Sequence, residues 1–312
     1  MPQEELLRRA FRLVLRNPLL WVLALLAGEG SGGSSFSSSG SSFSGGGGSR
    51  DAQGTHAAQH LAALGSWVLA NLASIALLVL VLLVIGLVVS CLAAGALYRA
   101  QSALDAGSPF GPGAALAAAT ESFGRVLGLR FLVLAAVLLV YILLGGFTVF
   151  MGMAGGRSAL AIAALIDASF LLFLGLLALV AWPVLTLAAR LVVLDGRAPF
   201  AALGEGLAML GRRPGRVALT AGISIALGIA VGVVFSIVDS LFAIPFIGPV
   251  NEAAATLDLA RIWTALLPLL LVLIPVSTAL GAVAGSFYST YWTLSYLALR
   301  SEAGAPSTAV SV

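Results

Sequence analysis

The chain has 312 residues, of which 60% are hydrophobic and only 9% are charged, and its mean hydropathy is +1.08. So few polar side chains cannot cover a soluble protein of this length, and lipid is the solvent that the composition indicates. The net charge of +3 does not point to nucleic acid, because the basic residues are spread along the chain and no nucleic-acid motif accompanies them. Long apolar runs in lipid favour helices over barrel strands. We therefore predict an all-α, polytopic helical membrane protein.

Six apolar segments are long enough, or nearly long enough, to cross a bilayer. The predicted spans are 13–28, 68–97, 127–151, 159–188, 217–238 and 262–297. Thirteen of the sixteen basic residues, all of them arginines, lie in four alternate segments: 2–16, 99–130, 190–216 and the tail that begins at Arg300. This is the positive-inside pattern, in which short cytoplasmic loops keep their arginines. It predicts a multi-pass protein of the bacterial inner (plasma) membrane with both termini in the cytoplasm.

The first span follows an amphipathic segment, 3–17, whose arginines lie beside an apolar stripe. The apolar core that follows, Pro18–Ala27, is short for a full crossing. A basic segment before a short apolar one is also typical of a signal peptide, here cleaved near Ala27. Both alternatives place residue 30 outside the cytoplasm, and the recurrence of the pattern later in the chain favours a retained helix.

Residues 29–55 differ in composition from the apolar spans on either side, because Ser31–Ser49 is nearly all glycine and serine. Such a composition cannot bury enough surface to order itself and predicts a flexible external loop. His56 and His60 follow it, spaced so that a helix would place both on one face. Two histidines without a third ligand make a weak metal site, so we predict neither a metal nor a cofactor.

Short motifs recur along the chain and indicate one integral membrane domain built from three tandem hairpins. Leu15-Arg-Asn-Pro18 is similar to Gly211-Arg-Arg-Pro214, and Leu104-Asp-Ala-Gly-Ser-Pro-Phe110 is similar to Leu194-Asp-Gly-Arg-Ala-Pro-Phe200. Each predicted unit holds an interfacial helix, a span, an external turn and a returning span, in one orientation. The predicted repeats are 1–104, 105–194 and 195–300, followed by a disordered tail at 301–312.

The predicted interfacial helices, 3–17, 113–127 and 199–213, each combine an apolar stripe with arginines at or beside one end. Such helices lie along the headgroup plane with guanidinium groups on lipid phosphates or in water. The arginines predicted as possible lipid-headgroup contacts are Arg8, Arg9, Arg12, Arg16, Arg125, Arg130, Arg212, Arg213 and Arg216. The alternative is that these helices are only connectors packed on the bundle.

The returning helices are longer than a bilayer needs, because their apolar pattern runs through 61–98, 159–194 and 262–299. They must tilt and protrude, or else break at Pro183, Pro268 or Pro275. Aromatic residues gather near the cytoplasmic end of the last span. They are Phe287, Tyr288, Tyr291, Trp292 and Tyr296, and form either an interfacial belt or a headgroup or substrate pocket.

Asp167 is the leading candidate for a functional charge inside a span, because ionisable groups in hydrocarbon are costly. It would serve as a proton-carrying or cation-contacting carboxylate in a transport site. The alternative is a structural position near the outer interface, hydrated or paired with Arg157. No motif of a hydrolase, metalloprotease or nucleotide-binding enzyme occurs, and we predict no catalytic residue and no enzymatic activity.

Two stretches of the chain resemble a family. The opening Phe11-Arg-Leu-Val-Leu-Arg-Asn-Pro18 and the segment from Leu194 through Pro214 into a span resemble uncharacterised bacterial polytopic proteins. Those proteins are related to the membrane domain that is fused to glycerophosphodiester phosphodiesterases. No soluble phosphodiesterase domain is present here, so the resemblance implies a lipid-related setting and no catalytic residue.

The sequence favours a non-catalytic membrane protein that organises lipid or a membrane partner, with anionic headgroups at the cytoplasmic face as the predicted contact. A partner protein or a homo-oligomer is compatible with this function, whereas a nucleic-acid partner is not predicted. The alternative is a small-molecule or ion transporter with a mid-membrane polar site near Asp167.

Overall fold

The computed structural model describes residues 3–29, 66, 69–256 and 259–302. The helices are α1 (Gln3–Arg16), α2 (Leu19–Ala27), α4 (Leu72–Asp105), α5 (Pro112–Leu194), α6 (Pro199–Arg212), α7 (Pro214–Thr256) and α8 (Leu259–Glu302). No strand occurs among the described residues, and the predicted all-α class is confirmed. The glycine- and serine-rich segment, His56, His60 and the tail beyond Glu302 lie outside the described residues.

Five helical stretches are long and apolar enough to cross a membrane. They are Leu72–Asp105, Pro112–Met153, Leu165–Leu194, Pro214–Phe242 and Leu266–Glu302. The pair α1 and α2 meets at an angle of 102° and supplies a sixth span only if the two are counted together. With 9 residues, α2 alone extends about 14 Å, roughly half of the hydrocarbon thickness. The chain is therefore a multi-pass helical membrane protein in which the first predicted crossing is a short, bent element.

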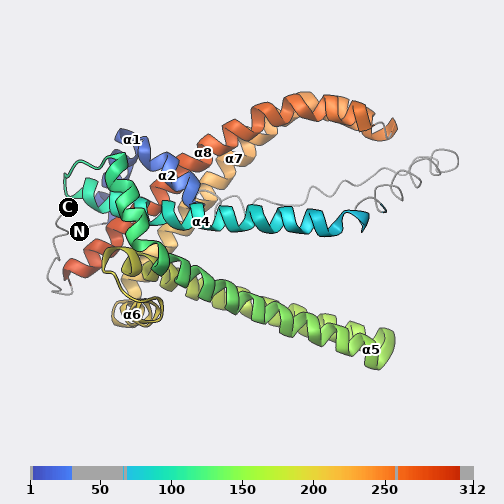
Figure 1. The fold of residues 1–312 in the computed structure, drawn as a ribbon, viewed down its shortest axis with the longest axis horizontal. Coiled ribbons are helices and arrows are strands. Elements are labelled where there is room, and N and C mark those ends of the chain that lie inside the picture. Colours follow the sequence, from blue (N-terminus) through green and yellow to red (C-terminus); the bar gives the residue numbers. More distant parts are fainter. Residues whose placement is uncertain (1–2, 30–65, 67–68, 257–258, 303–312) are drawn as a thin grey trace.

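Helix α5 turns back on itself. Its 83 residues would extend about 125 Å if they were straight. Thr148 Oγ1 nevertheless donates a hydrogen bond to Asp167, 19 residues further on. Figure 1 shows the two arms lying against each other, and α7 and α8 form a second such pair, in which Ser277 Oγ donates to Asp239 Oδ1 at 3.0 Å. Two of the predicted hairpins are thus present.

Two of the three predicted interfacial helices are separate elements, α1 and α6. Each ends next to a proline, Pro18 or Pro214, which has no backbone N–H to continue the helix. The third, 113–127, is the first part of α5 and continues into the span without a break. The segment between Ala114 and Leu127 contains no proline, and its alanines favour an unbroken helix, so it is helical as predicted but not a separate element.

The prolines inside the long helices do not end them. Pro183 lies within α5, and Pro268 and Pro275 lie within α8. The long helices therefore do not break at these prolines, which leaves the other predicted alternative, that they tilt and protrude. Figure 1 shows that α8 curves along its length, as expected where prolines remove intrahelical hydrogen bonds.

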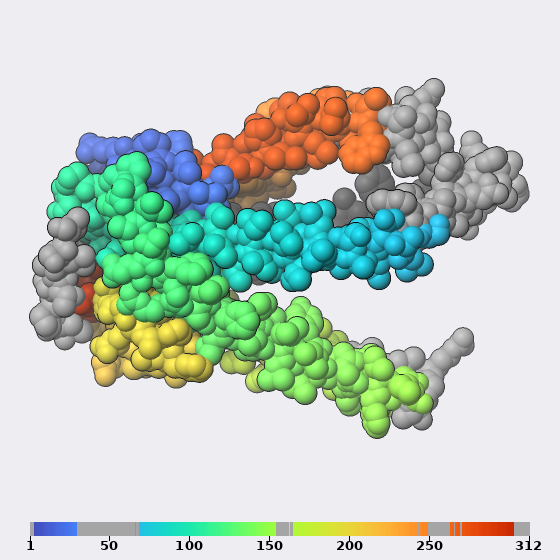
Figure 2. Space-filling view, viewed as in Figure 1, coloured from blue at the N-terminus to red at the C-terminus, as the bar shows by residue number. Residues whose placement is uncertain are grey.

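Buried residues concentrate at one end of the molecule, which we call the helical head (residues 3–29, 91–130, 182–217 and 282–302). Beyond the head, only 6–17% of each 18-residue apolar window is buried inside the protein. Figure 2 shows α4, α5 and the α7–α8 pair extending from the head as separate arms. The arms expose leucine, valine and phenylalanine, as expected of surfaces that lie in lipid.

Helix α6 lies across the spans, and Figure 1 shows it nearly end-on beside α5. One face is packed tightly, because a Cβ at Gly206 would meet the Val184 carbonyl oxygen at 3.0 Å. The opposite face is open, with Phe200 74% exposed and Leu207 61% exposed. An amphipathic helix with one buried small-residue face and one exposed apolar face fits the headgroup boundary of a bilayer.

Candidate functional site

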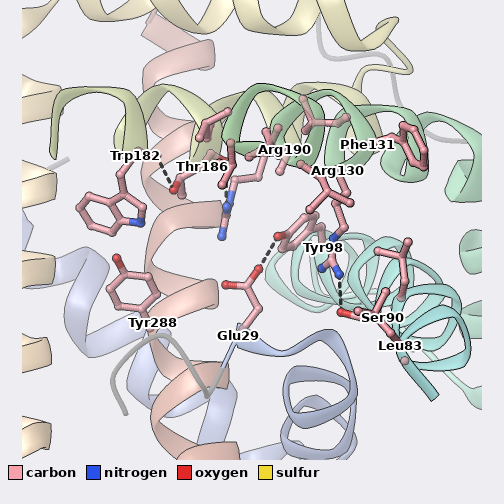
Figure 3. A pocket seen from close by; sticks show the side chains of 18 residues that line it. Glu29, Leu83, Ser90, Tyr98, Arg130, Phe131, Trp182, Thr186, Arg190 and Tyr288 are labelled. Atoms are coloured by element: carbon pink, nitrogen blue, oxygen red, sulfur yellow. Dashed lines mark hydrogen bonds between the residues drawn. The ribbon is translucent and has the colours of Figure 1, made fainter. Parts of the chain in front are cut away.

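A cavity of about 730 Å³ opens where α4 and the two arms of α5 leave the helical head, beside the end of α2 and α8. Figure 3 shows the side chains that line it. Its polar lining comprises Glu29, Ser90, Tyr98, Arg130, Trp182, Thr186, Arg190 and Tyr288. Its apolar lining includes Leu83, Leu87, Phe131, Leu134 and Val137.

Arg190, on the returning arm of α5, is deeply buried, because only 1% of the residue is exposed. Its Nη1 donates to the Thr186 carbonyl oxygen at 2.7 Å, and its Nη2 donates to the Ser289 carbonyl oxygen at 3.3 Å. The guanidinium carbon lies 4.5 Å from the centroid of the Tyr98 ring, a cation–π geometry. The Nε atom is buried without a hydrogen-bond partner among the described residues.

A polar layer behind Arg190 fixes its position. Gln101 is fully buried, and its side-chain oxygen accepts hydrogen bonds from Thr293 at 2.7 Å and Ser289 at 3.4 Å. Ser289 in turn meets Arg190 through both its carbonyl and its hydroxyl oxygen. These contacts join α4 to α8 and hold the guanidinium against the cavity.

Arg130 reaches the cavity from the first arm of α5. It donates to Ser90 Oγ on α4 and, at 3.1 Å, to the Ala27 carbonyl oxygen at the end of α2. A cation at this position complements the partial negative charge of a helix C-terminus. The chain then leaves α2 through Gly28, whose φ of 78° is left-handed. Glu29, the next residue, accepts a hydrogen bond from the Tyr98 hydroxyl.

Neither Arg130 nor Arg190 forms an ion pair with any residue that the structure describes, although most of the other described arginines do. The observed pairs are Arg8–Glu4, Arg9–Asp105, Arg99–Glu121, Arg125–Glu121, Arg197–Glu205, Arg213–Glu302, Arg216–Glu302 and Arg300–Asp195. Glu29 is the one acidic residue in the cavity lining, and its described partner is a hydroxyl. The lining therefore carries two guanidinium groups against one carboxylate.

The cavity is amphipathic. Its charged groups lie at the helical head, whereas its apolar walls continue into the exposed arms of α4 and α5. Leu83 is 57% exposed and Phe131 is 62% exposed, so the wall opens onto the surface that faces lipid. A molecule with a charged end and a hydrocarbon end would match both regions.

The predicted aromatic group divides between the cavity and the core. Tyr288 lines the cavity and stacks on Trp182, with ring centroids 5.9 Å apart. Tyr291, Trp292 and Tyr296 are buried in the head. The last of these donates to Asp195 Oδ2 at 2.8 Å. The fifth member, Phe287, packs edge-to-face against Phe11 of α1, with ring centroids 6.2 Å apart. The pocket alternative therefore applies to Tyr288, whereas the other four pack between helices.

The nine arginines predicted to contact headgroups fall into three classes. Five are in the ion pairs given above, namely Arg8, Arg9, Arg125, Arg213 and Arg216. Three are exposed, with no carboxylate partner among the described residues, namely Arg12, Arg16 and Arg212. The ninth, Arg130, lines the cavity. Headgroup contact by the exposed three stays a prediction.

Asp167 lies in the returning arm of α5, close to the reversal of the hairpin, and contacts Thr148. It lines neither of the two described cavities. Arg190 follows Asp167 by 23 positions in the same helical arm, which corresponds to about 35 Å. The structure thus separates Asp167 from the arginine-lined cavity.

The sequence did not predict that the residues lining this cavity lie together. Arg190 was identifiable as a cation closing a span, and Arg130 as one opening another, but no pattern showed that they face each other. Comparison with protein-family models, with curated proteins and with solved structures gives no match, so the resemblance to bacterial polytopic proteins stays a prediction.

Proposed function

We propose that this chain is a non-catalytic, accessory integral membrane protein that binds an anionic lipid in the arginine-lined cavity. The supporting observation is that Arg190 is buried beside apolar walls without a carboxylate partner. A buried charge is costly unless it is paired, and a lipid phosphate is the counter-ion that a membrane supplies. A guanidinium group matches phosphate oxygens in charge and geometry.

The apolar walls extend the proposal from an anion to a lipid. Leu83 and Leu87 on α4, and Phe131 and Leu134 on α5, line the same cavity. Figure 3 shows Leu83 and Phe131 on these two helices. Acyl chains that lie between these residues would cover the apolar surface on the open side of the cavity. Each buried methylene contributes about 0.8 kcal/mol when it leaves water, so the chains add affinity in a soluble assay as well as orientation in the membrane.

The proposed location is the bacterial inner membrane, with the helical head and both termini in the cytoplasm. The paired and exposed arginines of the head support this orientation through the positive-inside rule. The exposed face of α6, with Phe200 and Leu207, would then lie at the cytoplasmic headgroup level. Anionic lipids are abundant in that leaflet and would reach the cavity laterally.

The geometry favours lipid binding over the alternatives. A transport site at Asp167 would need a polar cavity around it, and Asp167 lines neither described cavity. Catalysis on a lipid would need a nucleophile with a general base, but the cavity lining contains no histidine or cysteine. The one carboxylate in the lining, Glu29, accepts a hydrogen bond from Tyr98.

The amount of lipid that co-purifies with the protein tests the proposal. Extracted in a mild detergent and analysed by native mass spectrometry, the wild-type protein should retain an acidic phospholipid. Arg130→Gln should reduce the retained fraction roughly tenfold, the effect of losing about one charge-assisted hydrogen bond. Arg197→Gln, which removes a half-exposed arginine outside the cavity, should retain lipid like the wild type. Equal retention by all three proteins would refute the proposal.

A further inference from the structure

We infer that Glu29 makes the cavity selective for a singly charged phosphodiester over a doubly charged phosphomonoester. This inference rests on the proposed lipid-binding function. It concerns which anionic headgroup the site takes, a question that the two arginines alone leave open. The candidate ligand class is a glycerophospholipid whose phosphate is esterified on both sides.

The formal charges of the lining support this selectivity. Arg130 and Arg190 contribute two positive charges and Glu29 one negative charge, so the lining carries +1. A phosphodiester carries one negative charge and leaves the filled site neutral. A phosphomonoester carries between −1.5 and −2 near pH 7 and would place excess charge in a weakly screened, partly apolar cavity.

Glu29 is held in place beside the anion site. It accepts a hydrogen bond from the Tyr98 hydroxyl, and Tyr98 is only 3% exposed. The ring of the same tyrosine lies against the Arg190 guanidinium. The carboxylate is thus tied through one rigid side chain to the cation that would bind the phosphate, and it lies beyond ion-pair distance of both arginines.

The arrangement leaves two guanidinium charges without a carboxylate partner while keeping one negative charge in the same cavity lining. Because Glu29 forms no ion pair with Arg130 or Arg190, no carboxylate among the described residues neutralises either guanidinium charge. A second negative charge on a bound phosphate would face Glu29, and like charges at short range in a low-dielectric site repel strongly. Glu29 therefore acts as a specificity-determining residue.

Glu29→Gln in the full-length protein tests the inference, because the amide still accepts a hydrogen bond from Tyr98 and removes only the charge. Binding of phosphatidylglycerol, a phosphodiester lipid, and phosphatidic acid, a phosphomonoester lipid, would be compared in detergent by native mass spectrometry. The wild type should prefer phosphatidylglycerol on the order of tenfold. Glu29→Gln should abolish that preference by binding phosphatidic acid more tightly.

Two controls accompany the measurement. Glu29→Asp keeps the negative charge and should keep the preference, and Glu205→Gln, which removes a carboxylate paired with Arg197 outside the cavity, should also leave it unchanged. Soluble glycerophosphoglycerol, which has the same phosphodiester without acyl chains, should bind more weakly than the lipid. Equal binding of that soluble compound would identify a water-soluble ligand and overturn the lipid assignment.

The outcomes separate the inference from the proposed function. An unchanged lipid preference in Glu29→Gln, with both lipids still bound, would overturn the role of Glu29 and leave lipid binding intact. Failure of the wild type to bind either acidic lipid would overturn the proposed function itself. A thermal melt of each variant without lipid shows whether the fold is retained.

Discussion

Arg190→Gln should weaken binding of an acidic phospholipid by roughly 10- to 100-fold. The substitution removes a buried cation whose hydrogen bonds to a phosphate are each worth about 1.5–3 kcal/mol. Arg190 is 1% exposed, so solvent does not screen this interaction as it would at the surface. Titrating phosphatidylglycerol into detergent-solubilised protein and following the rise of the melting temperature measures the change in affinity.

The melting temperature without lipid distinguishes a ligand-binding role from a purely structural one. If Arg190 is retained to bind an anion, Arg190→Gln should keep or raise the lipid-free melting temperature, because an unpaired buried charge is lost. If its bonds to Thr186 and Ser289 hold the fold, the lipid-free melting temperature should fall. A fall with unchanged lipid affinity would contradict the proposed site. Arg190→Lys, which keeps the charge without the planar group, should bind with intermediate affinity.

Gly95→Val should cause the largest loss of stability of any single substitution considered. A Cβ at Gly95 on α4 would overlap the Ser122 Oγ of α5 and lie 3.3 Å from its Cβ. Ser122 is fully buried, and its hydroxyl donates to the Ala118 carbonyl oxygen at 2.7 Å, so it has little room to move. Overpacking at such a site costs about 3 kcal/mol, and thermal unfolding in detergent should show a melting temperature lower by roughly 10 °C.

The matched control is Gly175→Val in α5. A Cβ there meets nothing within 4 Å, and the position lies on an apolar arm outside the head. Its melting temperature should stay close to that of the wild type. Adding Ser122→Gly to Gly95→Val should restore part of the lost stability, because the clashing side chain is then absent. Equal destabilisation by the two valine substitutions would show that the contact between α4 and α5 is not tight.

The lipid-facing part of the fold was predictable because it depends on apolar composition and on prolines that end helices. The apolar runs indicated the spans, and Pro18 and Pro214 explain why α1 and α6 end as predicted. The same logic explains why 113–127 is not a separate element, because no proline separates it from the span. Such signals are local in the sequence, and local patterns predict helix ends well.

The cavity was not predictable in the same way because its residues are close in space and far apart in the chain. Ser90, Arg130 and Arg190 come from three different stretches of helix, and the rotation of each helix decides whether its side chain faces lipid or the cavity. Apolar surfaces in lipid show little periodicity, so the sequence does not reveal that rotation. Arg130 was predicted as one of nine possible headgroup contacts, and its position in the cavity lining, with hydrogen bonds to Ser90 and Ala27, could not be predicted.

An experimental structure of the protein in lipid nanodiscs that contain phosphatidylglycerol tests the central claim most directly. We expect phosphate density within hydrogen-bond distance of both Arg130 and Arg190, with acyl density between α4 and the first arm of α5, along Leu83 and Phe131. An empty cavity, or a rearrangement in which Glu29 pairs with Arg190 and closes the site, would contradict the account.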